Sequence, residues 1–205
     1  MEPIRVQKRG IERRNVVLET AIKLFAEKGY DNTSIQDIIK IAGGSNTMIY
    51  KTYGNKQGLF AAAVEFLIQK IFESSSKVDY QGLSLREELC EYGIRVLTAF
   101  FEPEALALYR LIVEESGHKG DLSRSFYENG MCKSYCYVCP ILRKHTALNE
   151  EQIQDLATFY VESLKFKHFH TALLLNQKID LETIRQDVSL SVDILLAYID
   201  KLTKQ

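Results

Sequence analysis

The chain has 205 residues, of which 46% are hydrophobic and 26% charged, so we expect a globular protein of one domain, or a small domain joined to a larger one. No apolar run approaches the roughly 20 residues of a membrane helix, and the charged N-terminus lacks a secretory signal, which predicts a cytoplasmic protein without a membrane segment. Residues 1–60 carry ten Lys and Arg against six Asp and Glu, whereas the remainder carries sixteen against twenty-one. That asymmetry favours an anionic partner at the N-terminal end, with chance scatter of surface charge as the alternative.

Helical periodicity begins near Arg14, and no segment alternates as a strand would. The first helix is predicted from one apolar face and ends at Gly29. Thr33 and Gln36 match a capping box that opens a short second helix. After the break at residues 42–44, Ser45 or Asn46 caps another short helix that runs to about Tyr53. The apolar residues assigned to the first two helices are Val17, Leu18, Ala21, Leu24, Phe25, Ile35, Ile38 and Ile39.

Longer helices are predicted in the rest of the chain, each with its own start signal. Asn55 caps one helix, and Ser84 with Glu87 opens another that continues to Pro103. Further helices span about 105–117 and 122–139, the second stopping before Pro140. Asn149 caps a helix through about residue 175, and Asp180 caps the last one. The chain is therefore predicted to be all-α, with about nine helices.

The third helix, which runs to about Tyr53, is too short to supply much of the core, and its outer face is polar. The question is what this polar face binds. Two short helices joined by a glycine turn form a helix-turn-helix unit. Asn pairs with adenine and a Thr methyl packs on thymine, while Tyr, Thr and Lys reach phosphates. Lys56, in the first turn of the next helix, is expected to hold a phosphate there. The outer face consists of Asn46, Thr47, Tyr50, Lys51 and Thr52.

From Arg14 to Leu59 the chain resembles the N-terminal domain of TetR-type transcriptional regulators. The residues that carry the resemblance are Val17, Leu18, Ala21, Leu24, Phe25, Gly29, Tyr30, Thr33, Ser34, Ile35, Ile38, Ile39, Ala42, Gly43, Ser45, Ile49, Tyr50, Tyr53, Lys56 and Leu59. Three positions depart from the family's pattern: Gly44 replaces an aliphatic residue, Thr47 a glycine and Tyr53 a phenylalanine.

The resemblance implies a homodimeric, ligand-responsive regulator, most often a repressor, that binds a palindromic operator in double-stranded DNA. It implies a helix-turn-helix DNA-binding domain at residues 1–55 and a helical ligand-binding and dimerisation domain at residues 56–205. We expect the last two long helices, about 150–175 and 181–202, to pair with a second copy as a four-helix bundle through the apolar stripe of each, which includes Val192 and Leu195 in the last helix. The N-terminal arm with Arg5, Lys8 and Arg9 is expected to add contacts to the DNA. The expected DNA-binding residues are Thr33, Ser34, Ser45, Asn46, Thr47, Tyr50, Lys51, Thr52 and Lys56.

Aromatic residues in the body helices indicate where an effector would bind, since small-molecule sites form between helices and are mostly apolar. Most of these side chains are expected to be core, and a subset is expected to line a cavity for a small, mostly apolar effector. The candidate ligand-binding residues are Phe100, Tyr109, Phe126, Tyr127, Phe159, Phe166 and His170.

Cys132, Cys136 and Cys139 form a C-x3-C-x2-C pattern, which is also a cluster-binding signature of radical enzymes. On a helix the three sulfurs share one face, which suits a buried stripe equally well, and a thiol or metal sensor is the main alternative. No phosphate loop, nucleophile elbow or metalloprotease motif occurs, so we expect neither catalysis, a cofactor nor a bound metal. The alternative to DNA binding is a helical protein-interaction module whose polar patch binds an acidic protein.

Overall fold

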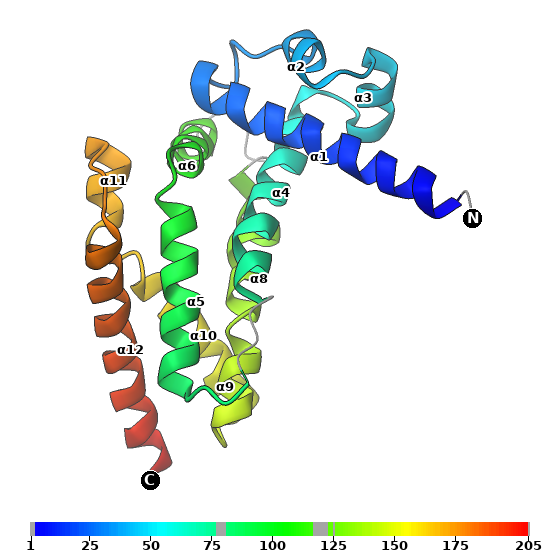
Figure 1. Cartoon of the computed structure of the whole chain (residues 1–205). Coiled ribbons are helices and arrows are strands. Elements are labelled where there is room, and N and C mark those ends of the chain that lie inside the picture. Colours follow the sequence, from blue (N-terminus) through cyan, green and yellow to red (C-terminus); the bar gives the residue numbers. More distant parts are fainter. Residues whose placement is uncertain (1–2, 77–80, 117–122, 125, 205) are drawn as a thin grey trace. The chain divides into compact units, whose positions relative to one another are not determined.

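In the computed structural model, which describes residues 3–76, 81–116, 123–124 and 126–204, all regular structure is helical (Figure 1). The predicted all-α fold is therefore confirmed. None of these helices is both long enough and apolar enough to cross a membrane. In chain order the helices are α1 (Pro3–Lys28), α2 (Ile35–Ala42), α3 (Asn46–Tyr53), α4 (Lys56–Ser76), α5 (Leu85–Phe100), α6 (Pro103–Ser116), a π-helical turn η1 (Tyr127–Met131), α8 (Cys132–Cys136), α9 (Cys139–His145), α10 (Glu150–Ser163), α11 (Phe169–Leu175) and α12 (Leu181–Thr203).

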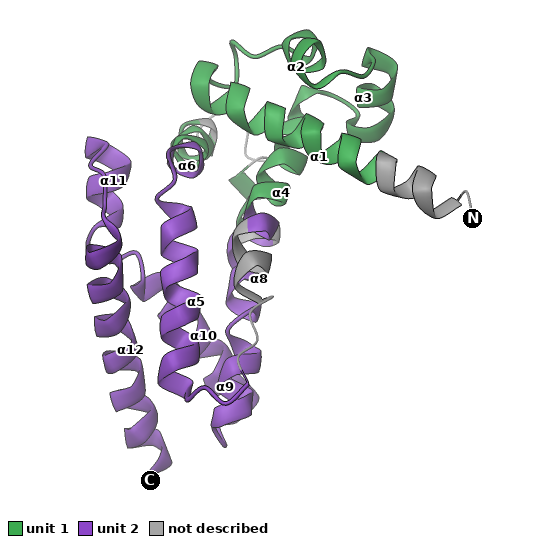
Figure 2. Ribbon diagram, in the orientation of Figure 1, with its two compact units in different colours: residues 1–67, 107–127 green, residues 68–106, 128–205 purple. Residues whose placement is uncertain are grey.

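The internal contacts of the chain divide it into two compact units (Figure 2). Unit 1 comprises residues 1–67 and 107–127, and unit 2 comprises residues 68–106 and 128–205. The first boundary falls inside α4, after residue 67, whereas the sequence predicted a domain boundary between residues 55 and 56. Helices α4 and α6 each contribute residues to both units.

The core of unit 1 is built on α1. Its apolar stripe, predicted from periodicity, is buried from Val17 to Phe25, and Ile38 and Ile49 bring α2 and α3 into the same core. Gly29 ends the helix with a positive φ of 80°, a conformation that favours glycine. Helix α1 begins at Pro3, well before its buried stripe, so its N-terminal half extends beyond the three-helix core. The side chains of Arg5, Lys8 and Arg9 lie outside the described residues.

Polar residues before the helices supply their N-caps, and one predicted start is wrong by a residue. Helix α2 is opened by Ser34 and Asp37, not by Thr33 and Gln36, because Ser34 Oγ accepts a hydrogen bond from the backbone N–H of Asp37 and the Asp37 carboxylate accepts one from that of Ser34. Thr33 is buried, and its hydroxyl donates inward to Gly29 O at 2.8 Å. The other predicted caps, Ser45, Asn55, Ser84, Asn149 and Asp180, each accept a hydrogen bond from a first-turn backbone N–H.

Unit 2 is held together by α5, which packs against α9 and α12, and by α10, which packs against α8, α9 and α12. Gly93 allows this close approach: a Cβ built there would lie 2.4 Å from the Tyr160 hydroxyl oxygen and 2.8 Å from Val188 Cγ1. The inner face of α12 is the apolar stripe predicted from the sequence. It is buried against α5 and α10 within unit 2. Its buried residues are Ile184, Val188, Val192, Leu195 and Ile199.

Two stretches predicted as single helices are divided. Pro140 lies in the first turn of α9, where its missing N–H costs nothing, so the proline begins a helix instead of ending the one before it. The long helix predicted from Asn149 stops at Ser163, and α11 starts separately at Phe169. An apolar pattern at helical spacing continues across both breaks, and this is why periodicity alone did not reveal them.

Candidate nucleic-acid interface

Helix α3 turns one residue inward and most of the others outward. Ser45 caps it by accepting a hydrogen bond from Met48 N at 3.2 Å, and Ile49 anchors it in the core of unit 1 with no exposed surface. Tyr50 is 50% exposed, although it is a large aromatic residue. An exposed tyrosine presents an apolar ring together with a hydroxyl group, which suits a polar ligand surface. The exposed residues here are Ser45, Asn46, Thr47, Tyr50, Lys51 and Thr52.

The turn between α2 and α3 depends on two glycines. Gly43 and Gly44 have φ values of 75° and 115°, which side chains rarely adopt. A Cβ on Gly44 would lie 2.8 Å from Met48 Cε, so the small residue that departs from the family's pattern suits this turn. Both glycines are exposed, and the backbone of the turn is therefore open to a partner.

Helix α1 contributes two arginines that the sequence analysis did not assign to the site. Arg13 Nη2 lies 3.9 Å from the point where a Cβ on Gly43 would be, beside the turn. The guanidinium of Arg14 lies near the hydroxyl of Tyr53 at the end of α3. Burial raises the pKa of the Tyr53 phenol, and the nearby Arg14 guanidinium offsets only part of that rise. No local sequence signal marks these arginines, because their place depends on how α1 crosses α3.

The backbone is closely packed at the junction between α3 and α4. Gly54 has a φ of 78°, and its N–H donates to Tyr50 O at 2.9 Å. Asn55 Oδ1 then accepts a hydrogen bond from Gly58 N at 2.8 Å, which caps α4. A Cβ on Gly58 would lie 2.0 Å from the carbonyl oxygen of Tyr53, so only glycine fits there. The end of α3 is thereby tied closely to the start of α4.

The first turn of α2 already holds an anion of its own. The hydroxyl and backbone N–H of half-buried Ser34 donate to Asp37 and hold the pKa of that carboxyl below its ordinary value. A phosphate approaching these N–H groups would meet a carboxylate. The Ser34 hydroxyl proton is already donated to Asp37, so a contact from Ser34 to a phosphate would have to replace that hydrogen bond. Thr33 points into the unit and does not belong to the surface.

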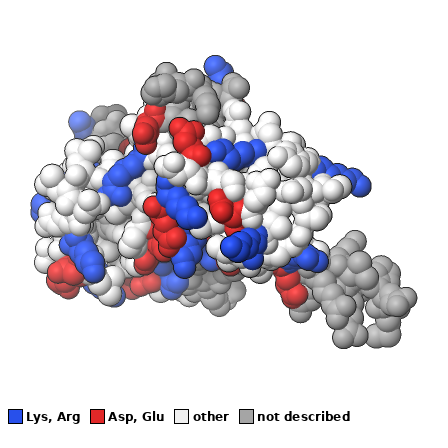
Figure 3. Space-filling model, turned by 90° about the horizontal axis from the view of Figure 1, so that it is seen from above, with Lys and Arg blue, Asp and Glu red and all other residues white. Residues whose placement is uncertain are grey.

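Charge is mixed around this surface. Figure 3 views the structure from above α2 and α3 as they lie in Figure 1, and on this face the described Lys and Arg side chains are interspersed with Asp and Glu. Lys51, at the end of α3, is exposed. The described basic residues on this face therefore do not form one large patch, so binding there would depend more on specific contacts from α3 than on the attraction of a basic surface.

Four of the seven candidate ligand-binding residues fall into two groups. In unit 1, Tyr109 and Phe126 pack edge to face with ring centroids 5.7 Å apart. In unit 2, Phe100 packs on Phe169 at 5.4 Å, and Phe169 in turn packs against the ring of His170 at 5.6 Å.

Three further candidates lie at the surface of the chain. Tyr127, Phe159 and Phe166 are 56%, 45% and 51% exposed. These side chains are not in the core, and about half of each is open to contact from outside its own unit.

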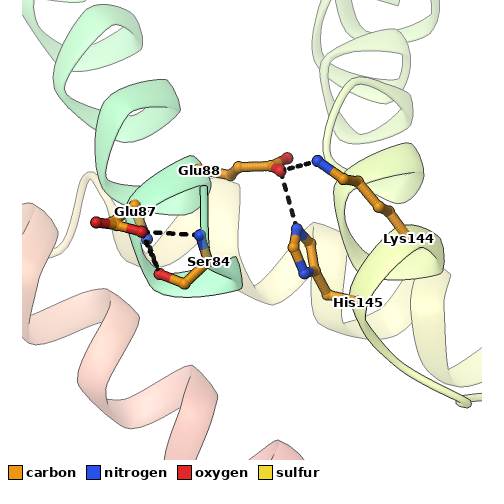
Figure 4. A network of polar contacts seen from close by, with 5 residues as sticks. All are labelled: Ser84, Glu87, Glu88, Lys144 and His145. Atoms are coloured by element: carbon orange, nitrogen blue, oxygen red, sulfur yellow. Dashed lines mark hydrogen bonds and ion pairs between the residues drawn. The ribbon is translucent and has the colours of Figure 1, made fainter. Parts of the chain in front are cut away.

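Two buried carboxylates in unit 2 were not expected from the sequence. Glu88 is 3% exposed and binds Lys144 and, at 2.9 Å, the Nε2 of His145 (Figure 4). Burial alone would raise the pKa of Glu88, but these hydrogen bonds and charges bring it below its ordinary value. Asp187, equally buried, pairs with His168 and lies 4.0 Å from Lys167. Each carboxylate links two helical segments through ion pairs, so its charge has a structural role.

The cysteine pattern does not form one helical face. Cys132 and Cys136 belong to α8 and Cys139 starts α9, with the break between them. Cys136 is exposed and Cys132 half-buried, whereas Cys139 is buried and burial raises the pKa of its thiol. Among the described residues no three His, Cys, Asp or Glu side chains are grouped as a metal site would need. The predicted common face is therefore wrong.

Comparison with protein families gives two matches that together span most of the chain. Residues 17–63 match the family described as bacterial regulatory proteins, tetR family. Residues 87–198, more than half of the chain, match the C-terminal domain of AefR-like transcriptional repressors.

Individual relatives point the same way. The chain is 33% identical over 115 residues to the uncharacterised HTH-type transcriptional regulator YezE of Bacillus subtilis, covering 54% of this chain and 59% of that one. It is 25% identical over 154 residues to IcaR of Staphylococcus aureus, a negative regulator of a biofilm operon, covering 73% and 70%. A crystal structure of a TetR-family regulator from Mesorhizobium loti superposes with a TM-score of 0.72 at 21% identity, covering 93% and 98%, and this likeness shows the fold.

Proposed function

Because the chain belongs to the TetR family of bacterial regulatory proteins, we propose that it is a ligand-responsive DNA-binding regulator, a repressor released from a palindromic operator by a small, mostly apolar effector. The name of IcaR as a negative regulator supports the repressing sense. A protein with this task works in the cytoplasm, where the DNA is.

The observation that carries the proposal is the outer face of α3. Helix α3 is short, is anchored in the core by Ile49, and has a turn with glycine at each end. Together with its N-cap Ser45 it presents six polar side chains at an exposed surface. We assign base recognition to Asn46 and Thr47, near the N-terminus of the helix, where recognition helices reach base edges. Tyr50, Lys51 and Thr52 are assigned to phosphates, together with Ser45. Arg13, beside the turn, is the arginine from α1 that can add a phosphate contact.

Selection of bound fragments from genomic DNA, followed by footprinting, tests this assignment. Tyr50→Ala should weaken binding to all sequences, because it removes a phosphate contact. Asn46→Ala or Thr47→Ala should chiefly change base preference, at a cost of about 1–3 kcal/mol for a lost base contact. A wild-type protein that selects no common sequence, or whose binding does not weaken with salt, would contradict the proposal.

The proposed homodimer gives the two reading helices a palindromic target, with half-sites roughly 34–36 Å apart. Helix α12 has an apolar outer face that its own unit leaves uncovered: Leu190, Ile194 and Tyr198 are 44%, 48% and 50% exposed and recur every four residues. We propose this face, together with exposed Phe159 of α10, as the dimer surface. The inner stripe of α12, which the sequence analysis proposed for pairing, is instead the core of unit 2.

For the effector we propose aromatic surroundings within residues 56–205, with the ring pairs of Tyr109 and Phe126 and of Phe100 and Phe169 as leading candidates. Such edges and faces bind apolar or aromatic molecules well. His170, which is exposed beside Phe169, would supply a polar contact.

A further inference from the structure

Lys56 is placed where a helix does not favour a cation. It is the first residue of α4, whose N-terminal end carries a partial positive charge, so a cation there is unfavourable. The sequence pattern predicts that a phosphate bound from outside compensates for this position. The contacts of its ammonium group give a different explanation, internal to unit 1.

The ammonium of Lys56 is bound by the turn that follows α1. Its Nζ donates to Tyr30 O at 2.9 Å and to Asp31 O at 3.4 Å, and it lies 4.4 Å from the centroid of the Tyr30 ring. These groups come just after the C-terminus of α1, the end of a helix at which a cation is favoured. The carbonyls and the aromatic face together offset the unfavourable position on α4.

Both ends of this link are firmly held. Tyr30 is buried and packs on Phe25 of α1 and Phe60 of α4, with centroids 5.7 and 5.3 Å away. On the α4 side, the cap by Asn55 and the close passage of Gly58 under the carbonyl of Tyr53 join the first turn of α4 to the end of α3. A shift of Lys56 relative to Tyr30 would therefore move α3 relative to α1.

We propose that Lys56 is a positioning residue for DNA binding: by tying α4 to the turn at residues 30–31, it sets the place of α3 relative to α1 and α2. The proposal rests on the proposed function, because it concerns the same reading helix. It differs from a phosphate contact in its physics. A half-buried ammonium committed to two carbonyls has at most one N–H left for DNA, whereas exposed Lys51 on α3 can turn freely to a phosphate.

The same substitution at the two lysines separates these roles. Lys56→Met and Lys51→Met are compared with wild type on the selected operator and on unrelated duplex over a range of salt, at a temperature where circular dichroism shows both variants folded. For Lys56→Met we expect about a tenfold loss of operator affinity with unchanged affinity for unrelated DNA and an unchanged salt slope. For Lys51→Met we expect a salt slope smaller by about 0.9, as for one lost phosphate.

Two results at Lys56 would overturn the inference. A weaker affinity for every duplex together with a smaller salt slope would make it a phosphate contact. Operator affinity equal to that of wild type would make the link irrelevant to reading. Hydrogen exchange without DNA provides a separate readout, since the inference requires faster exchange of α3 amides in Lys56→Met, and an unchanged rate would also overturn it. If wild type bound no specific duplex, the proposed function would fail, and the exchange measurement would still decide the link.

Discussion

Gly58 sets how closely α4 can follow α3, and Gly58→Ala should break that junction. The new methyl carbon would lie 2.0 Å from a backbone oxygen that has no room to yield, so the first turn of α4 must shift. We expect a loss of about 1–3 kcal/mol in the free energy of unfolding of unit 1 and weaker operator binding, measured by chemical denaturation and duplex titration. Gly10→Ala is the matched control, because Gly10 is a helical glycine with no atom within 4 Å of the added carbon. It should be neutral or slightly stabilising. Equal stability of the two variants would show that the junction is loose.

Glu88 is a buried carboxylate that should make unit 2 sensitive to acid. Its folded pKa is depressed, so its ion pairs contribute stability above the unfolded pKa near 4.5, and that contribution is lost as pH falls through the lower folded pKa. Glu88→Gln should lower the free energy of unfolding at pH 7 by about 1–3 kcal/mol, through weaker hydrogen bonds to Lys144 and His145. It should also lose less stability than wild type as pH falls below the unfolded pKa near 4.5.

Denaturation midpoints at several pH values check this expectation. Glu91→Gln is the control on the same helix, because Glu91 pairs with Arg95 only at the surface, at 3.8 Å. That variant should stay within about 0.5 kcal/mol of wild type at pH 7. If Glu88→Gln had the same pH dependence as wild type, the acid sensitivity would come from other carboxylates.

At the scale of the element, α12 has two apolar faces with different tasks. Val192 is completely buried against unit 2, whereas Ile194, two residues on, is 48% exposed. Ile194→Arg should give folded monomers, since it places a charge in the proposed dimer surface. Val192→Arg should instead unfold unit 2, because it buries an unpaired charge in the core.

Sedimentation over a range of concentrations, combined with circular dichroism, distinguishes these two outcomes. A dimer that survives Ile194→Arg unchanged would place the interface on another element. A folded, stable Val192→Arg protein would mean that the packing of α12 on α5 and α10 is weaker than the burial of its inner face indicates.

At the scale of the whole molecule, the expected control by an effector requires coupling between effector binding and DNA binding. A tenfold loss of DNA affinity needs about 1.4 kcal/mol of differential affinity for the state that does not bind DNA. Tyr109→Ala or Phe126→Ala should weaken the response to an effector and leave DNA binding in its absence intact, because the two rings pack on each other and neither residue belongs to α2 or α3. Operator titrations with candidate aromatic effectors measure this response. Val113→Ala, at a 56% exposed position of the same helix as Tyr109, is the control. Responses equal to wild type in both ring variants would remove this ring pair from the effector site.

The sequence by itself determined the local structure of the N-terminal unit and the character of its outer surface. The stripe from Val17 to Phe25, the cap at Ser45 and the capping residue Asn55 are local signals, because each depends on neighbours within one or two turns. The same holds for the polar face of α3. Ile49 is the buried residue of this short helix, and the polar residues around it face solvent.

Only the tertiary structure decided which apolar or charged residue meets which partner. Periodicity places Val192 and Leu195 on one face of α12, but it does not say whether that face meets the same chain or a second copy. Lys56 pairs with Tyr30 and Asp31, and Glu88 pairs with Lys144 and His145. The partners in these pairs lie 25 to 57 residues apart in the sequence. Such pairs depend on how the helices cross, and a pattern that repeats every 3.6 residues carries no information about distances beyond its own helix.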